Sequence, residues 1–177
     1  RRAWLLRNVI LPTYRWSGIF AEIVVVGEFE PGEGYTSIPA DSIYHNCADA
    51  LWKRQLGFDA LKHNVEWTLF QHDDHLYDPT NPYPHTRTVA SVLSPSRWTR
   101  ARGAAEPLND GHSDGYVNGH ACLMRSTILP PFNWSRIAPV FTWDVEVTAA
   151  LRDLALPWAY TPEIKVWDVE IGAEPWR

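Results

Sequence analysis

The sequence predicts an α/β protein whose mixed, mostly parallel sheet carries helices on both faces. The segment EIVVVG, residues 22–27, is a continuous apolar run rich in β-branched residues, which is typical of a strand buried on both faces. A helical pattern follows over residues 47–63, and a second apolar run, VEWTLF, begins at Val65. Strand, helix and strand in close succession indicate a βαβ unit, which places two parallel strands in one sheet.

The other elements follow in order along the chain. Residues 3–16 can form a helix that stops near Pro12 or a short strand over residues 9–11, and we favour the helix. Residues 28–42 are rich in glycine, proline and acids and are expected to form a loop, after which Asn46 caps the helix over residues 47–63. The second half is predicted to contain strands over residues 88–93, 117–125 and 164–167, a long loop over residues 94–116, a proline-interrupted connection over residues 128–139, and a helix over residues 141–156 capped by Thr142.

Length and composition narrow the function classes. The chain has 177 residues, enough for a single domain over residues 1–177, and its net charge of -5 argues against a nucleic-acid partner. Cys47 and Cys122 lie far apart and match no zinc-finger spacing, which favours a reducing, cytoplasmic location. No apolar run reaches the roughly 20 residues that cross a bilayer. The only methionine is Met124, so we expect an N-terminally truncated fragment, and the oligomeric state stays open.

The second strand ends in a polar cluster, His72, Asp73, Asp74 and His75. Ligands bind at such strand ends in α/β folds. Oxygen ligands beside imidazoles suit a divalent cation, and Mg²⁺ or Mn²⁺ is favoured if a phosphate completes the shell. A polar turn is the alternative, because aspartate is common in turns. These residues alone leave both interpretations open.

Other polar groups allow two interpretations each. Asp144 and Glu146 fall in the first turn of the helix over residues 141–156. They take part in catalysis, or they are there only because the helix dipole stabilises carboxylates at this position. His120 follows Gly119 and binds a ligand or packs. The long loop holds arginines that suit either a diphosphate clamp or a solvated surface, and two tryptophans suit either sugar stacking or the core; these are Arg97, Arg100 and Arg102, and Trp134 and Trp143.

In this order the features resemble the GT-A fold of family 2 nucleotide-sugar glycosyltransferases, from residue 22 to residue 167. The segment RQLG, Arg54–Gly57, looks like the family's Arg-x-x-Gly pattern, and LFQHDDH is similar to the L-F-L-D-D-D that carries its D-x-D motif. VNGHACLMR resembles the glycine-led strand that lines the acceptor site. WDVEV is similar to the E-D-x-E-L type of segment that holds the catalytic base.

The resemblance implies an inverting transfer of a sugar from a nucleotide-diphosphate donor to a carbohydrate or other hydroxyl acceptor, with Mn²⁺ or Mg²⁺. It implies that the family's first strand lies before Arg1. The implied residues are Asp144 and Glu146 in catalysis, Asp74 and His72 at the metal, and Glu28, Arg54, Asp73, Gly119 and His120 at the nucleotide sugar. His72 and Trp143 stand where the family has acids. The donor and acceptor themselves are not indicated.

Two other function classes remain. The HDDH cluster suits a metal-dependent hydrolase, which needs several histidine ligands and an open water position. His85, His112 and His120 are available for this, although no HxH or HExxH spacing links them. The departures at His72 and Trp143 suggest instead a binding module that kept the fold and lost catalysis.

Overall fold

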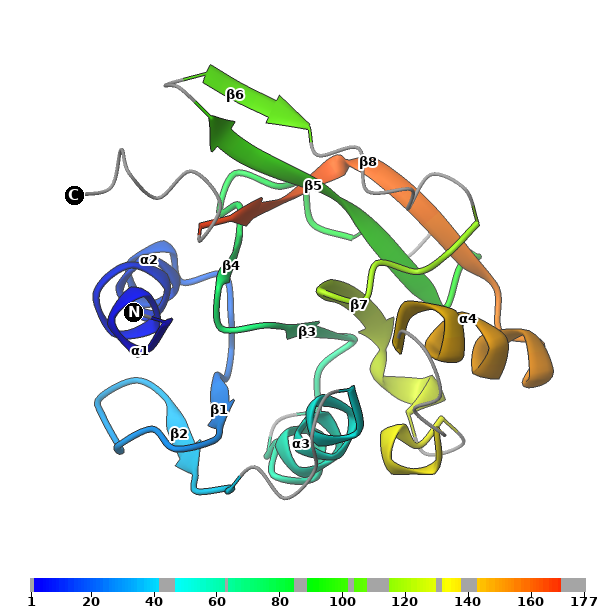
Figure 1. The fold of residues 1–177 in the computed structure, drawn as a ribbon, viewed down its shortest axis with the longest axis horizontal. Helices are drawn as coiled ribbons and strands as arrows, with labels where there is room; N and C mark the ends of the chain where they lie inside the picture. The colour runs from blue at the N-terminus through cyan, green and yellow to red at the C-terminus, as the bar shows by residue number, and fades with distance from the viewer. Residues whose placement is uncertain are drawn as a thin grey trace.

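Two β-sheets and helices from three parts of the chain form a mixed α/β fold (Figure 1). The computed structural model describes residues 2–41, 47–62, 64–84, 89–101, 104–107, 115–129, 132–137 and 143–169. Predicted features at Asn46, Thr142, His85, His112 and Arg102 lie outside these residues. Among the described residues, each helix is too short or too polar to cross a membrane.

The N-terminal segment is one helical rod that runs past Pro12. It consists of α1 (Arg2–Leu5), the π-helical η1 (Leu6–Ile10) and α2 (Leu11–Ser17). The wide turn of η1 precedes Pro12, which lies in the first turn of α2, where a missing N–H is tolerated. The rod ends at Gly18, whose φ of +63° is the left-handed conformation that glycine adopts easily. The helix was therefore predicted correctly and its end near Pro12 wrongly.

A small parallel sheet follows, made of β1 (Val24–Val26) and β2 (Thr36–Ile38). All three residues of β1 are half-buried, so the prediction of a strand buried on both faces was wrong. The predicted loop over residues 28–42 contains β2. Because β1 belongs to this small sheet whereas the strand after the helix, at residues 67–71, belongs to the larger sheet, the predicted βαβ unit in a single sheet was also wrong.

The larger sheet has the order β3-β7-β5-β8-β4, and β6 pairs with the last four residues of β5, Trp98 to Ala101. Within this larger sheet, only β5 and β8 are parallel, and its other described pairings are antiparallel. The prediction of a mostly parallel sheet was therefore wrong for these residues. The strands are β3 (Trp67–Gln71), β4 (His75–Tyr77), β5 (Val92–Ala101), β6 (Ala104–Pro107), β7 (Ala121–Arg125) and β8 (Trp158–Asp168).

The described part of the predicted long loop over residues 94–116 is mostly strand. Strand β5 extends to Ala101, and β6 pairs with its end in the antiparallel direction. Ser94, Ser96 and Thr99 of β5 are buried. Strand β8 pairs with β5, and Ser96 Oγ lies 2.9 Å from Pro162 O and 3.0 Å from Ile164 O, within hydrogen-bond distance of both carbonyls. Tertiary pairing thus overrides a composition typical of loops.

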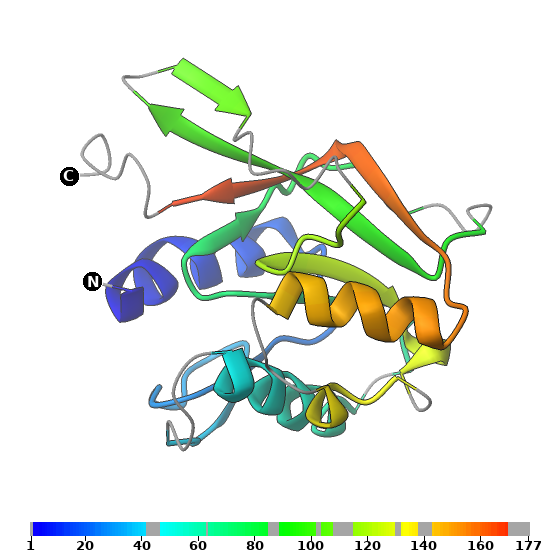
Figure 2. The same cartoon turned by 45° about the vertical axis from the view of Figure 1, so that its right-hand side comes forward.

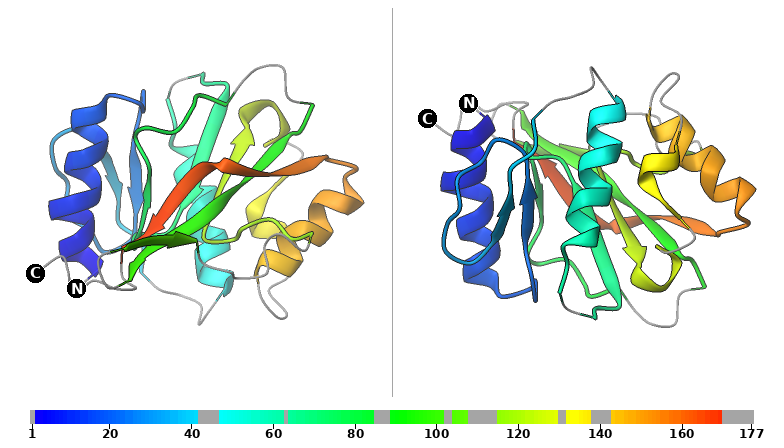
Figure 3. Two further views of the ribbon diagram at one scale, coloured as in Figure 1. Left: turned by 90° about the horizontal axis from the view of Figure 1, so that it is seen from above. Right: turned by 90° about the horizontal axis from the view of Figure 1, so that it is seen from below.

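Alternate residues of β7 belong to two different hydrophobic clusters. Ala121 and Leu123 pack with the N-terminal rod, whereas Cys122 and Met124 pack with α3 (Cys47–Asp59) and α4 (Trp143–Asp153). Successive side chains of a strand point to opposite faces, so these clusters lie on opposite sides of β7. Figure 2 shows α3 and α4 near β7, and Figure 3 shows the rod and α4 at opposite ends of the molecule. The predictions of α3, α4, β7 and β8 were confirmed, with shifted ends.

Candidate functional site

The HDDH segment forms a tight turn between two strands. The N–H of His75 donates to the carbonyl of His72 at 3.3 Å, which leaves Asp73 and Asp74 at the two central positions. Asp73 is exposed, whereas Asp74 is 6% exposed. The segment is therefore the polar turn that composition suggests, and the turn also brings the two histidines at its ends toward one another.

A third histidine, His120, lies directly before the neighbouring strand β7. Gln71 of β3 lies opposite Ala121 of β7, and one step further the N–H of His72 donates to the carbonyl of His120 at 3.0 Å. The ring centroids of His72 and His120 are 5.1 Å apart. The antiparallel register thus joins the HDDH turn to the GH segment, Gly119 and His120. His120 lies 48 residues after His72 in the sequence.

These three histidines, His72, His75 and His120, form the histidine cluster. Each offers one nitrogen, and the three nitrogens lie within 4.8 Å of one another. His75 is 1% exposed, and the other two are half-buried. The rings of His75 and His120 are stacked with centroids 5.1 Å apart. Three imidazoles at this spacing can ligate one divalent transition-metal ion.

Asp74 orients one of these imidazoles. Its Oδ1 lies 2.6 Å from Nδ1 of His75, and because an ionised carboxylate only accepts hydrogen bonds, Nδ1–H is the donor. In neutral His75 the lone pair is then on Nε2, which forms no hydrogen bond with the described residues. Oδ2 of Asp168 lies 3.9 Å from Nε2, and Arg97 donates to that carboxylate at 2.7 Å.

Burial affects the protonation of the cluster. Desolvation, followed by the charges of Arg54, His120 and His75, holds the pKa of His72 well below its usual range, against the opposing effect of Asp74. His72 is therefore neutral near pH 7. A neutral imidazole has the lone pair that a metal ion requires.

Arg54 connects the cluster to α3 and to the start of α4. Its guanidinium is buried, donates to the carbonyl of Gly119 at 2.7 Å and lies over the ring of Trp134 at 4.9 Å. Burial lowers the pKa of Arg54 to about 10, and the groups of Cys122 and Asp144 oppose this shift. Arg54 thus stays charged at neutral pH, close enough to interact electrostatically with Asp144.

Hydrogen bonds position the segment that carries His120, directly before β7. Asn118, which is fully buried, accepts from the N–H of His120 through its Oδ1 at 2.9 Å, and its own N–H donates to Ser94 Oγ at 2.7 Å. The N–H of Val117 donates to Thr148 Oγ1, which donates to the carbonyl of Asp144 at 2.7 Å. The start of α4 and the segment of Gly119 and His120 are therefore joined by buried and partly buried hydrogen bonds.

The predicted site residues divide into two sets. Arg54, His72, Asp74, Gly119, His120 and Asp144 are joined by the contacts above, and Asp73 lies exposed on the same turn. Glu28 is exposed beyond β1 of the small sheet, and Glu146 is half-buried two residues after Asp144. Arg97 pairs with Asp168, and Trp134 is a fully buried core residue. The side chains of Arg100 and Trp143 lie outside the described residues.

The structural roles of three site residues, His75, Asp168 and Asn118, were not predicted from the sequence. His75 was included in the HDDH cluster as a candidate metal ligand but not among the residues that the resemblance implies, although it is the most buried histidine of the cluster. Asp168 faces it because β4 pairs with β8 in the register His75 opposite Asp168. Asn118 belongs to the glycine-led segment, but its side-chain role depends on long-range contacts. Only His75 had a local signal.

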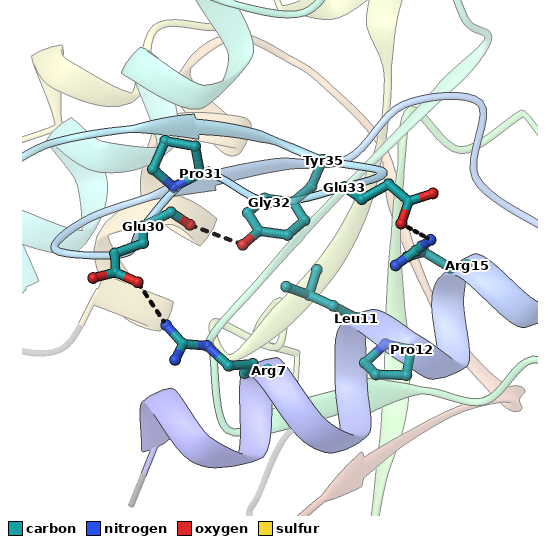
Figure 4. A pocket seen from close by; sticks show the side chains of 9 residues that line it. All are labelled: Arg7, Leu11, Pro12, Arg15, Glu30, Pro31, Gly32, Glu33 and Tyr35. Carbon is teal, nitrogen blue, oxygen red and sulfur yellow. Dashed lines mark hydrogen bonds and ion pairs between the residues drawn. The ribbon is translucent and has the colours of Figure 1, made fainter.

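A separate cavity lies between the N-terminal rod and the loop before β2. Its volume is about 330 Å³, and Figure 4 shows Arg7 beside Glu30 and Arg15 beside Glu33 at its walls. The ion-pair distances are 3.6 and 3.0 Å. Because these charges already pair across the cavity, we assign no ligand to it.

Comparison with known proteins identifies no relative: no protein-family model matches the chain, and no curated protein matches it. Function is therefore inferred from the residues of the site and from the motif resemblance.

Proposed function

We propose that the chain is a glycosyltransferase domain of the GT-A type that moves a sugar from a nucleotide-diphosphate donor to a carbohydrate or other hydroxyl acceptor, with inversion and with a divalent cation. The observation that supports this is the convergence of four separate motif-like segments. Arg54, the HDDH turn, the Gly119–His120 segment and Asp144 are distant in the sequence and are joined by hydrogen bonds or electrostatic contacts.

Asp144 is the proposed catalytic base. A carboxylate that accepts the proton of the acceptor hydroxyl contributes about 10²–10⁴-fold to the rate. Arg54 is close enough to favour the ionised form that a base requires. A bound divalent cation would supply charge stabilisation for the leaving diphosphate. The resemblance alone supports Mn²⁺ or Mg²⁺ as that cation.

The remaining roles have less structural support. Arg54, Asp73, Gly119 and His120 are proposed to contact the nucleotide sugar because they lie on the HDDH turn or next to the segment that is hydrogen-bonded to it. Glu28 at the nucleotide and Glu146 in catalysis depend on the resemblance only. The cytoplasmic location stays a prediction from the cysteine pattern.

A metal-dependent hydrolase is the second candidate function, and the histidine cluster favours it. Catalytic zinc sites use three protein ligands, including three histidines, and keep one position open for water. This candidate requires no nucleotide sugar.

The test is a screen of UDP-, GDP- and dTDP-sugars by calorimetry and transfer assay, with and without Mn²⁺. We expect one donor class to bind in a metal-dependent way and Asp144→Asn to reduce transfer about 10²–10⁴-fold without changing donor affinity. The matched control is Asp153→Asn, on the exposed last turn of the same helix, which should keep full activity. Full transfer by Asp144→Asn removes the base assignment. Ester or phosphoester hydrolysis without any nucleotide-sugar binding favours the hydrolase.

A further inference from the structure

The donor set of the cluster differs from the one that the family resemblance implies. That resemblance places carboxylate oxygens around Mn²⁺ or Mg²⁺, which suit such hard ions. Here Oδ1 of Asp74 is engaged by Nδ1–H of His75 at 2.6 Å, and Asp73 is exposed on the turn. The groups that lie together are instead three imidazole nitrogens within 4.8 Å of one another.

We propose that His72, His75 and His120 bind one transition-metal ion of the nitrogen-preferring class, represented by Zn²⁺ and Co²⁺, and that Asp74 is a positioning residue which orients His75 without binding the metal. The inference concerns the same site as the proposed function, but metal binding tests it whichever reaction the site performs.

The contact between Asp74 and His75 supports this division of roles. Histidines that bind a metal through one nitrogen commonly donate the other N–H to a carboxylate, which fixes the ring and its tautomer. Asp74 does this at Nδ1, so Nε2 of the 1%-exposed His75 is left as the ligand atom. The N–H of Val169 also donates to the carbonyl of Asp74 at 3.0 Å, which holds the turn against the end of β8.

The spacing of the nitrogens suits a small tetrahedral ion. With Zn–N bonds of about 2.0–2.1 Å, two ligand atoms of a tetrahedral site lie about 3.4 Å apart. To reach that distance from the present limit of 4.8 Å, the half-buried rings of His72 and His120 must rotate toward the buried ring of His75. Three protein ligands leave a fourth position for water or for an oxygen of a substrate.

The first experiment uses metal alone. The 177-residue chain is stripped with EDTA and titrated with Zn²⁺, Co²⁺ and Mg²⁺ by calorimetry, and bound metal is counted by elemental analysis. We expect one Zn²⁺ or Co²⁺ per chain, a visible Co²⁺ spectrum typical of four-coordinate nitrogen sites, and far weaker binding of Mg²⁺. Failure of the wild-type chain to bind one equivalent of Zn²⁺ or Co²⁺, or equal affinity for Mg²⁺, overturns the inference.

Variants then separate ligands from the positioning residue. His120→Gln, or His72→Gln if the first variant loses its native near-ultraviolet circular dichroism, should weaken Zn²⁺ binding by more than about 100-fold, beyond the cost of losing an outer-shell partner. Asp74→Asn should weaken it about 10–100-fold. The matched control Asp73→Asn removes the same charge one residue away and should stay within about threefold, because exposed charges interact weakly. Equal losses for Asp73→Asn and Asp74→Asn contradict the positioning role.

The two proposals fail in different ways. Stoichiometric Zn²⁺ binding without transfer from any nucleotide sugar leaves the metal site in place and removes the transferase. Transfer that Mg²⁺ supports, in a chain that does not bind Zn²⁺ or Co²⁺, removes the metal site and leaves the transferase.

Discussion

Arg54 donates to the carbonyl of Gly119 at 2.7 Å, across 65 residues of sequence. This contact fixes the distance between α3 and the segment that carries His120. A buried guanidinium requires such a partner because desolvation of an uncompensated charge is costly. Arg54 is therefore part of the framework of the site in addition to its proposed contact with a nucleotide sugar.

Replacing Arg54 by methionine should destabilise the protein by about 2–4 kcal/mol, because the Gly119 carbonyl loses its donor in a buried place. Urea unfolding followed by tryptophan fluorescence measures this loss. Arg15→Met is the control: its ion pair with Glu33 has side chains that are 44% and 86% exposed, so its loss should cost less than about 1 kcal/mol. A loss of less than about 1 kcal/mol for Arg54→Met would show that Arg54 does not support the fold.

The elements predicted from the sequence are those with a local signal. The apolar periodicity of α3 and α4, and the apolar runs of β3 and β7, exist before any tertiary contact forms. Strand β5 has no such signal beyond Leu93, because Ser94, Ser96 and Thr99 are polar. They are buried only through pairing with neighbouring strands, a long-range effect that single-sequence patterns do not contain.

The same distinction applies to the candidate site. The HDDH turn is visible in the sequence because its four residues are adjacent. The approach of His120 requires the antiparallel register of β3 and β7, and that of Asp168 requires the pairing of β4 with β8. Neither register follows from local composition, so the sequence offered His120 to the HDDH cluster only as one of three available histidines, with His85 and His112.

Tyr14 connects the N-terminal rod to the strands on both sides of the HDDH turn. Its hydroxyl donates to Gln71 Oε1 at 2.7 Å and accepts from the N–H of Tyr77 at 2.8 Å, and burial raises its pKa. Tyr14→Phe leaves the buried N–H of Tyr77 without its acceptor, so we expect a loss of about 1–3 kcal/mol in chemical unfolding. Tyr83→Phe, at a residue that is 64% exposed, should change stability by less than about 0.5 kcal/mol. Similar values for both variants would contradict the role of Tyr14.

Cys122 should be unreactive in the folded protein. Burial raises the pKa of its thiol to about 11, against the opposing effect of Arg54, so the reactive thiolate is scarce at pH 8. In a Cys47→Ser background, a colorimetric disulfide reagent should label Cys122 only after urea is added. Adding Thr127→Cys, at an exposed position, supplies a positive control that reacts at once. Rapid labelling of Cys122 in native buffer would show that the hydrophobic core around this residue opens readily.

Asp78 should make stability depend on pH in acid. Burial raises the pKa of Asp78, but hydrogen bonds from Thr80 and from Trp167 Nε1, with the charge of Lys165, outweigh burial and lower it. A carboxyl whose pKa is lower in the folded state stabilises the protein fully above its unfolded pKa of about 3.9, and this contribution is lost as the pH falls through the folded value.

Asp78→Asn should therefore destabilise the protein by about 1 kcal/mol at pH 7, a low value for a charged hydrogen-bonding group because the side chain is partly exposed. The difference between wild type and variant should stay constant down to about pH 5 and shrink below about pH 4, because the wild-type carboxyl becomes protonated there. Urea unfolding at pH 7, 5 and 3 measures it, with Glu163→Gln at an exposed position of β8 as the control. A difference between wild type and Asp78→Asn that is the same at all three pH values would show that ionisation of Asp78 contributes nothing to folding.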